Sequence, residues 1–248
     1  MMNLAEYRRH GSRLADYLPW AALVAPGVVL NKDGSFQRTA RFRGPDLNSA
    51  VPAELVAVAG RLNSALRRLG SGWALFVEAQ RHDAGAYPES FFPDPASALV
   101  DAERKAGFAE AGSHFESSYF LTFTWLPPAE DAARAESWLY EGRARDGVDP
   151  HEVLSAFIDR TDRVLLLVEA FMPECRWLDD AETLTYLHGC ISTRRQRMRV
   201  PETPMYLDVL LADQPLTGGL EPMLGDQHLR VLTIVGFPTA TTPGILDD

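Results

Sequence analysis

Apolar and polar positions follow two rhythms along this chain, and the clearest stretch predicts a β-hairpin. The apolar residues 28–30 lead into an Asn-Lys-Asp-Gly turn at residues 31–34. Beyond the turn, Phe36, Ala40 and Phe42 alternate with polar residues, which is the period of two expected for a half-buried strand. A turn rich in Asn, Asp and Gly between two such runs is typical of a hairpin.

The remaining patterns predict five helices and four further strands. After Pro52, leucine and valine recur every three or four positions, and Gly70 follows as a C-cap residue. Asp149 and Pro150 suit the N-cap and first position of a long helix. The expected helices span residues 52–69, 97–110, 129–142, 150–171 and 181–191. The expected strands span residues 73–80, 117–126, 205–212 and 228–237.

The order of these elements indicates the fold class. We expect an α/β (α+β) domain in which helices cover one mixed, largely antiparallel sheet. The order leaves open a division into sub-lobes at residues 1–143 and 144–248. Residues 3–17 suit a short polar helix or an extended arm.

Composition and charge exclude several classes of protein. The formal net charge is −10, so a general polyanion-binding surface is excluded and any contact with nucleic acid needs a local patch. The amino terminus shows no signal-peptide pattern. The longest uncharged run, residues 17–30, contains two prolines and is shorter than the roughly twenty apolar residues of a membrane-spanning helix. Cys175 and Cys190 are expected to be reduced thiols.

The densest basic run contains Arg194, Arg195, Arg197 and Arg199. Three functional interpretations are open for it: contact with anionic lipid, with DNA or with an acidic partner. The alternative is a solvated linker, because no aromatic residues are interleaved with the arginines. A smaller basic cluster at Arg8, Arg9 and Arg13 is open to the same choice between contact and solvation.

No constellation of residues indicates catalysis or metal binding. His188 and Cys190 are two positions apart, so a helix would point them to different sides, and no further ligand lies nearby in sequence. Asp226 and His228 lack a third partner that would organise them with Ser192 or Thr193. We therefore expect no catalytic, cofactor or metal site.

Several blocks in the same order resemble the CagE/TrbE/VirB family of type IV secretion and conjugation ATPases. They span residues 15–47, 62–81 and 186–248, with FFPDPASALVDAERKAGF and HFESSYFLTFTWLPP between them. The resemblance is to the amino-terminal domain of the TrbE type and extends over nearly all of the chain. It implies a cytoplasmic protein peripheral to the bacterial inner membrane, with that domain followed by a RecA-like motor domain.

The motor's chemistry is missing from these 248 residues. A P-loop needs G-x-x-x-x-G-K-[S/T], whose backbone amides hold the phosphates while the lysine neutralises their charge. The two lysines, Lys32 and Lys105, each follow a residue other than glycine. The resemblance therefore implies that ATP and Mg²⁺ belong to a motor domain absent from this chain.

What remains is an expectation of docking and assembly. The resemblance implies that Tyr17, Leu18, Trp20 and Leu23 form an exposed docking surface for inner-membrane subunits, although burial beneath the sheet is the alternative. The other expected partners are the motor domain of the same protein and further copies of this chain. The competing hypothesis is a nucleic-acid-binding module that feeds DNA to the motor and depends on the four arginines.

Overall fold

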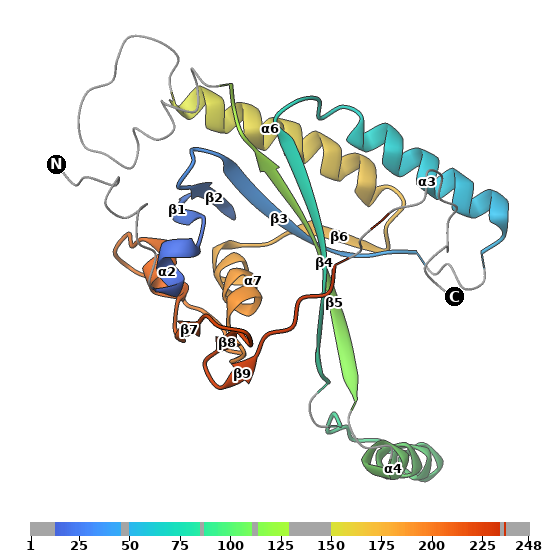
Figure 1. The fold of residues 1–248 in the computed structure, drawn as a ribbon. Helices are drawn as coiled ribbons and strands as arrows, with labels where there is room; N and C mark the ends of the chain where they lie inside the picture. The colour runs from blue at the N-terminus through green and yellow to red at the C-terminus, as the bar shows by residue number, and fades with distance from the viewer. Residues whose placement is uncertain are drawn as a thin grey trace.

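A six-stranded antiparallel sheet lies between two layers of helices (Figure 1). The computed structural model describes residues 13–45, 50–84, 87–110, 114–128, 150–233 and 236. The strands of the sheet are β1 (Trp20–Ala25), β2 (Val28–Asn31), β3 (Phe36–Arg43), β4 (Trp73–Asp83), β5 (Phe115–Trp125) and β6 (Glu174–Trp177). The described helices are α2 (Leu14–Tyr17), α3 (Pro52–Leu66), α4 (Pro95–Glu110), α6 (Pro150–Glu169), α7 (Asp180–Ile191) and α8 (Leu207–Leu211). The predicted α+β fold class is confirmed.

Strand β3 organises the sheet, whose order is β1-β2-β3-β5-β4. One edge of β3 pairs with β5 from Phe36 to Phe42. Its other edge is shared, because β2 pairs with the beginning of the strand and β6 pairs with residues 40–43. The predicted hairpin at residues 28–42 is confirmed, and Gly34 in its turn has a φ of +84°. β6 was not predicted, and it joins the second half of the chain to the same sheet.

The prediction of a half-buried β3 is wrong for the beginning of the strand. Phe36 and Ala40 face α6, and both are buried. Gln37 and Thr39, on the opposite face, are buried as well. The polar residues tolerate burial because they are paired: the Trp20 indole donates to Gln37 at 3.3 Å, and the Thr39 and Thr122 hydroxyls lie 2.9 Å apart.

Helices α6 and α3 cover one face of the sheet. Phe157 of α6 is fully buried and stacks on Phe36 and Trp73, with ring centroids 5.6 Å apart in each pair. Trp73 in turn stacks on Trp125 of β5. Offset aromatic stacking of this kind adds to the stabilisation from apolar burial. The predicted helices at 52–69 and 150–171 are confirmed as α3 and α6.

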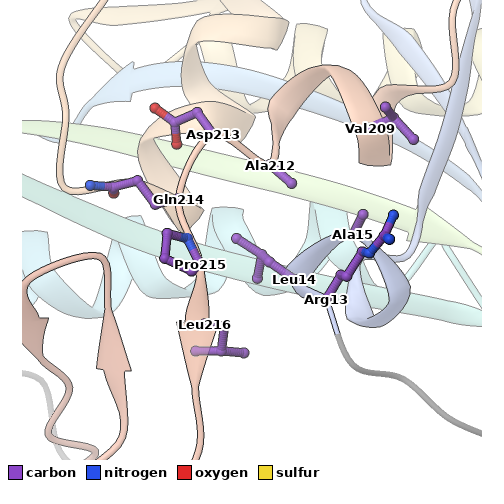
Figure 2. A pocket seen from close by; sticks show the side chains of 9 residues that line it. All are labelled: Arg13, Leu14, Ala15, Val209, Ala212, Asp213, Gln214, Pro215 and Leu216. Atoms are coloured by element: carbon purple, nitrogen blue, oxygen red, sulfur yellow. The ribbon is translucent and has the colours of Figure 1, made fainter.

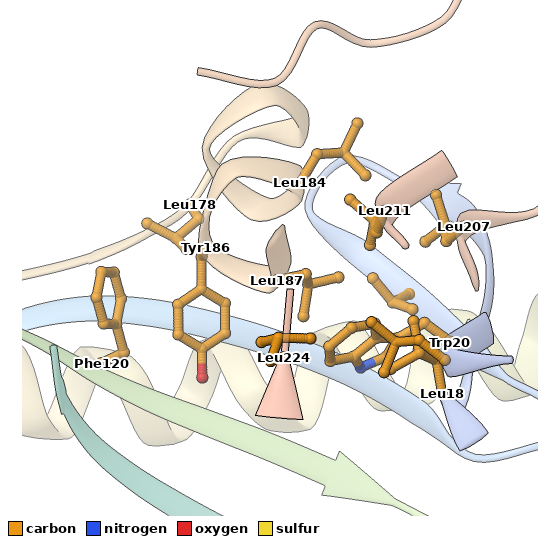
Figure 3. Close-up of a cluster of buried hydrophobic side chains, with 12 residues drawn as sticks. Leu18, Trp20, Phe120, Leu178, Leu184, Tyr186, Leu187, Leu207, Leu211 and Leu224 are labelled. Atoms are coloured by element: carbon orange, nitrogen blue, oxygen red, sulfur yellow. The ribbon is translucent and has the colours of Figure 1, made fainter. Parts of the chain in front are cut away.

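The opposite face is covered by α7, α8 and α2, which enclose the apolar cluster in Figure 3. Leu184 and Leu187 of α7 and Leu207 and Leu211 of α8 are among its most deeply buried members. Asp179 caps α7 by accepting from the Glu182 amide at 2.8 Å. The predicted helix at 181–191 is therefore confirmed.

The last third of the chain departs from the prediction. The strand expected at 205–212 is wrong, because α8 places Leu207 and Leu211 on one helical face toward the core. The strand expected at 228–237 is also wrong in its described portion. Only Gln227–His228 pairs there, as β9 beside β8 (Met223–Leu224), which also pairs with β7 (Leu216–Thr217).

Other predictions are extended or stay open. The strands at 73–80 and 117–126 are confirmed and lengthened as β4 and β5. The helix at 129–142 lies outside the described residues, and the division into sub-lobes at residues 143 and 144 stays a prediction. None of the helices within the described ranges is long and apolar enough to cross a bilayer.

Candidate interaction surfaces

The predicted docking surface at the amino terminus is only partly exposed. Leu18 and Trp20 belong to the core cluster beneath the sheet, and Leu23 packs against it. Tyr17, at the end of α2, is 65% exposed. The prediction of four exposed docking residues is therefore corrected: β1 joins the sheet, and this pairing turns Trp20 inward, where its indole finds Gln37.

An open groove of about 450 Å³ lies beside α2 (Figure 2). Its polar groups are largely engaged within the protein. Asp213 lies 3.1 Å from the imidazole of His188, and Gln214 accepts from the Thr193 amide at 3.0 Å. The lining residues are Arg13, Leu14, Ala15, Val209, Ala212, Asp213, Gln214, Pro215 and Leu216. Because the groove is open and both Asp213 and Gln214 already bond within the protein, it suits contact with a protein or surface better than a small-molecule site.

The four arginines of the predicted basic patch are all exposed and lie in the segment between α7 and α8. They are Arg194, Arg195, Arg197 and Arg199. None of the four forms an ion pair with another described residue. The segment is nevertheless held to the domain. The Met198 amide donates to the Thr185 hydroxyl at 3.0 Å, and the Met198 side chain packs against the core cluster. The smaller basic cluster has only Arg13 among the described residues.

A polar cluster joins α7 to β4. The Tyr186 hydroxyl donates to Glu78 at 2.9 Å, and Gln80 donates to the same carboxylate at 3.0 Å. The Cys190 sulfur lies 3.4 Å from Glu78. Local desolvation of the sulfur, followed by the nearby carboxylate, raises the pKa of Cys190 to about 12. A thiol held protonated in this way is a poor nucleophile.

The other groups considered for chemistry bond to nearby side chains, and His188 and Ser192 share one partner, the Asp213 carboxylate. His188 is buried against Asp213, and His228 lies 3.4 Å from Glu221. Ser192 and Thr193 both donate to Gln214. Burial raises the pKa of Cys175 to about 11. Among the described ranges, no three His, Cys, Asp or Glu side chains gather closely enough to hold a metal ion.

A surface that the sequence did not single out is the arm, which is formed by strands β4 and β5 together with α4 and the connecting residues 87–94. These two strands pair along eleven residues each, and α4 sits at their far end, away from the helical layers (Figure 1). Helix α4 buries none of its residues. Phe91 is 89% exposed and Leu99 is 65% exposed. The helix at 97–110 is therefore confirmed, but its apolar residues face away from the core.

The arm has a defined shape despite this exposure. The Tyr87 hydroxyl donates to Asp101 of α4 at 2.7 Å. The Phe108 ring stacks on His114 with centroids 3.6 Å apart, and Tyr87 meets Phe108 edge-on. Exposed apolar residues on an ordered projection are typical of a protein-binding surface.

Comparison with known proteins places the chain in a family. The family described as type IV secretion system ATPase VirB4/TrbE, N-terminal domain, matches residues 27–133. The whole chain is 35% identical, over an alignment of 264 residues, to conjugal transfer protein TrbE of Rhizobium radiobacter. It covers 32% of that protein, so it spans about a third of the length of this relative.

Two proteins of Sinorhizobium fredii (strain NBRC 101917 / NGR234), named as the first and second parts of a probable conjugal transfer protein TrbE, each match a portion of the chain. The chain is 39% identical to the first over 146 residues, an alignment covering 58% of this chain and 98% of that protein. It is 38% identical to the second over 66 residues, covering 27% of this chain and 10% of that protein. The resemblance seen in the sequence is confirmed: the chain belongs to the VirB4/TrbE family of type IV secretion ATPases and matches its N-terminal domain.

Proposed function

We propose that this domain is a non-catalytic docking and assembly module that couples an ATP-driven motor to the inner-membrane channel of a conjugal transfer system. The observation that carries the proposal is the arm. Its apolar residues are exposed and are not covered by any other part of the described fold, which is expected if another protein covers them. Leaving Phe91 and Leu99 in water is unfavourable by roughly 25 cal/mol for each Å² of apolar surface. Burial against another protein recovers that free energy.

The relation to the motor is supported by the two Sinorhizobium fredii proteins. Their names mark them as parts of one TrbE, and both match portions of this chain. We infer that the amino-terminal domain binds the motor portion through noncovalent surface contacts in addition to any covalent link along the polypeptide. ATP hydrolysis is assigned to that portion, because the 248 residues contain no P-loop pattern. In this proposal, the domain works at the cytoplasmic face of the inner membrane.

The experiment is capture of the inner-membrane subunits of the same transfer system by the tagged chain. The arm variant combines Phe91→Ser with Leu99→Ser, and Val56→Ser on α3 serves as a control because Val56 is exposed outside the arm. We expect the arm variant to reduce capture about tenfold or more, since apolar anchors dominate interface energies. Its melting temperature stays near that of the wild type, because exposed substitutions change stability by about 0.5 kcal/mol or less.

Two results would contradict the proposal. If the unmodified chain captures none of the inner-membrane subunits, it has no docking role. If capture survives in the arm variant, docking uses another surface and the arm loses its assignment. An ATPase assay adds a separate check, because turnover by this chain above background would refute its description as non-catalytic.

A further inference from the structure

Exposed apolar side chains border the arginine segment, and this combination identifies the kind of partner that the surface fits. The segment connects the end of α7 to the start of α8, which pack against each other. It contains four arginines and a single acidic residue, Glu202. Asp208, the next acidic residue along the chain, is already paired with Lys32 at 2.8 Å. The local charge is therefore strongly positive, although the whole chain is acidic.

The segment is anchored at both ends and in its middle. Thr193 is bonded through its amide and hydroxyl to Gln214, which is buried. Met198 is tied to α7 through the hydrogen bond to Thr185 and packs against the core. The segment ends at Tyr206, the N-cap of α8, and Leu207 and Leu211 of that helix are buried in the core. These anchors hold the backbone of the segment against the domain, so less conformational freedom is lost when the arginines bind.

The apolar neighbours distinguish between possible anionic partners. Val200, Met205, Tyr206 and Val209 are all exposed. Leu207 and Leu211 point into the core and Leu210 packs against it, whereas Val209, which lies between Leu207 and Leu211, is exposed. Figure 2 shows Val209 on α8, where it also lines the groove beside α2. The four arginines and these exposed apolar residues thus lie within one stretch of chain, residues 194–209, and together form one candidate contact surface.

A bilayer of anionic lipid matches both components of that surface. Its phosphates attract the arginines, and its interfacial region accepts aliphatic and aromatic side chains. A nucleic-acid backbone offers the phosphates alone and leaves exposed valine and methionine in water. We propose that the arginine segment, Tyr206 and Val209 form a contact site for the anionic phospholipid surface of a membrane. The inference deepens the proposed docking role and rests on it, because it specifies a second contact that orients the domain at the membrane.

The test measures sedimentation of the 248-residue chain with vesicles. One vesicle preparation is phosphatidylcholine, and the other contains equal parts of phosphatidylcholine and phosphatidylglycerol. We expect binding to the anionic vesicles only, weakening as salt rises. Replacing all four arginines by glutamine is expected to lower the affinity by about two orders of magnitude or more, since each basic residue near such a surface contributes about fivefold.

A matched control removes the same amount of charge elsewhere. Arg61→Gln, Arg67→Gln, Arg68→Gln and Arg104→Gln lie on or beside α3 and α4 and are all exposed. This variant should bind anionic vesicles nearly as well as the wild type. Tyr206→Ser with Val209→Ser tests the apolar component and is expected to reduce binding about tenfold. Far-UV circular dichroism and thermal unfolding confirm that each variant is folded.

Three results would overturn the inference. The first is equal binding to neutral and anionic vesicles, and the second is an equal loss in the control and the segment variants. The third is tight binding of duplex DNA that depends on the four arginines while vesicle binding does not. Vesicles carry no protein, so failure here leaves the capture of inner-membrane subunits unaffected and separately testable.

Discussion

Gly27 connects the two halves of the chain, and its replacement by alanine tests how closely they pack. The residue lies in the turn between β1 and β2 with a φ of +66°. Its amide donates to the Asp180 carboxylate of α7 at 2.6 Å. A Cβ at this position would overlap the backbone oxygen of Leu178. Leu178 cannot withdraw easily, because its own amide donates to Thr39 of β3 at 3.0 Å.

The expected cost of Gly27→Ala follows from these contacts. The left-handed backbone costs a non-glycine residue about 1–2 kcal/mol. A displaced turn weakens a hydrogen bond to a charged group, which contributes about 1.5–3 kcal/mol. We therefore expect the free energy of unfolding to fall by about 2.5–5 kcal/mol. For a protein of this length, that corresponds to a decrease in Tm of about 5–20 °C.

Urea unfolding followed by far-UV circular dichroism measures the effect, with Gly70→Ala as the control. Gly70 has a similar φ of +72°, but a Cβ there would meet no atom within 4 Å. Its replacement should therefore cost only the backbone term of about 1–2 kcal/mol. Comparable m-values for both variants would show that the same unfolding transition is being compared. Equal losses of stability in the two variants would refute the close approach of Gly27 to Leu178.

Three further predictions concern the core, an ion pair and a thiol. Phe157→Ala removes the centre of the aromatic stack and should lower the free energy of unfolding in urea by about 3–5 kcal/mol. The near-UV circular dichroism signal should also decrease. A loss of stability below about 1 kcal/mol would contradict the packing. The hydrogen bond from Arg176 lowers the pKa of Glu182 to about 2 in the folded chain, from 4.5 in the unfolded chain. The ionised Glu182 therefore contributes its full stabilisation of the fold above pH 4.5, and this contribution is lost as the pH falls toward 2. Glu182→Gln should therefore reduce stability at pH 7 by about 1 kcal/mol or less, because the pair is partly exposed, and the difference from wild type should vanish near pH 2. Iodoacetamide should label Cys190 at pH 8 more slowly in the folded chain than in urea, as followed by mass spectrometry. Glu78→Gln should accelerate labelling of the folded chain. An unchanged labelling rate in this variant would refute the contact between Cys190 and Glu78.

The local sequence was sufficient to predict those helices and strands whose pattern of apolar and polar residues fits only one type of secondary structure. The hairpin at residues 28–42 combines alternating apolar residues with a turn that needs glycine at position 34, so nearby residues sufficed to specify it. Helix α3 has an apolar stripe long enough to exclude a strand, and Pro52 and Pro150 mark the beginnings of α3 and α6. The family resemblance also came from sequence, because several blocks occur in one order.

Tertiary structure decided the elements and surfaces that depend on distant residues. The pattern of residues 205–212 suits a strand or a helix equally well, and the helix is selected because Leu207 and Leu211 then both reach the core. The sequence left Trp20 open as an exposed docking residue. In the structure, β1 pairs with β2, and Trp20 points inward and donates a hydrogen bond to Gln37. The helix predicted at residues 97–110 forms as α4, yet it lies at the end of the β4–β5 hairpin, beyond the layers that would bury it. The sequence by itself therefore determined local conformation and family, whereas burial, and with it the position of each interaction surface, depended on which distant segments meet.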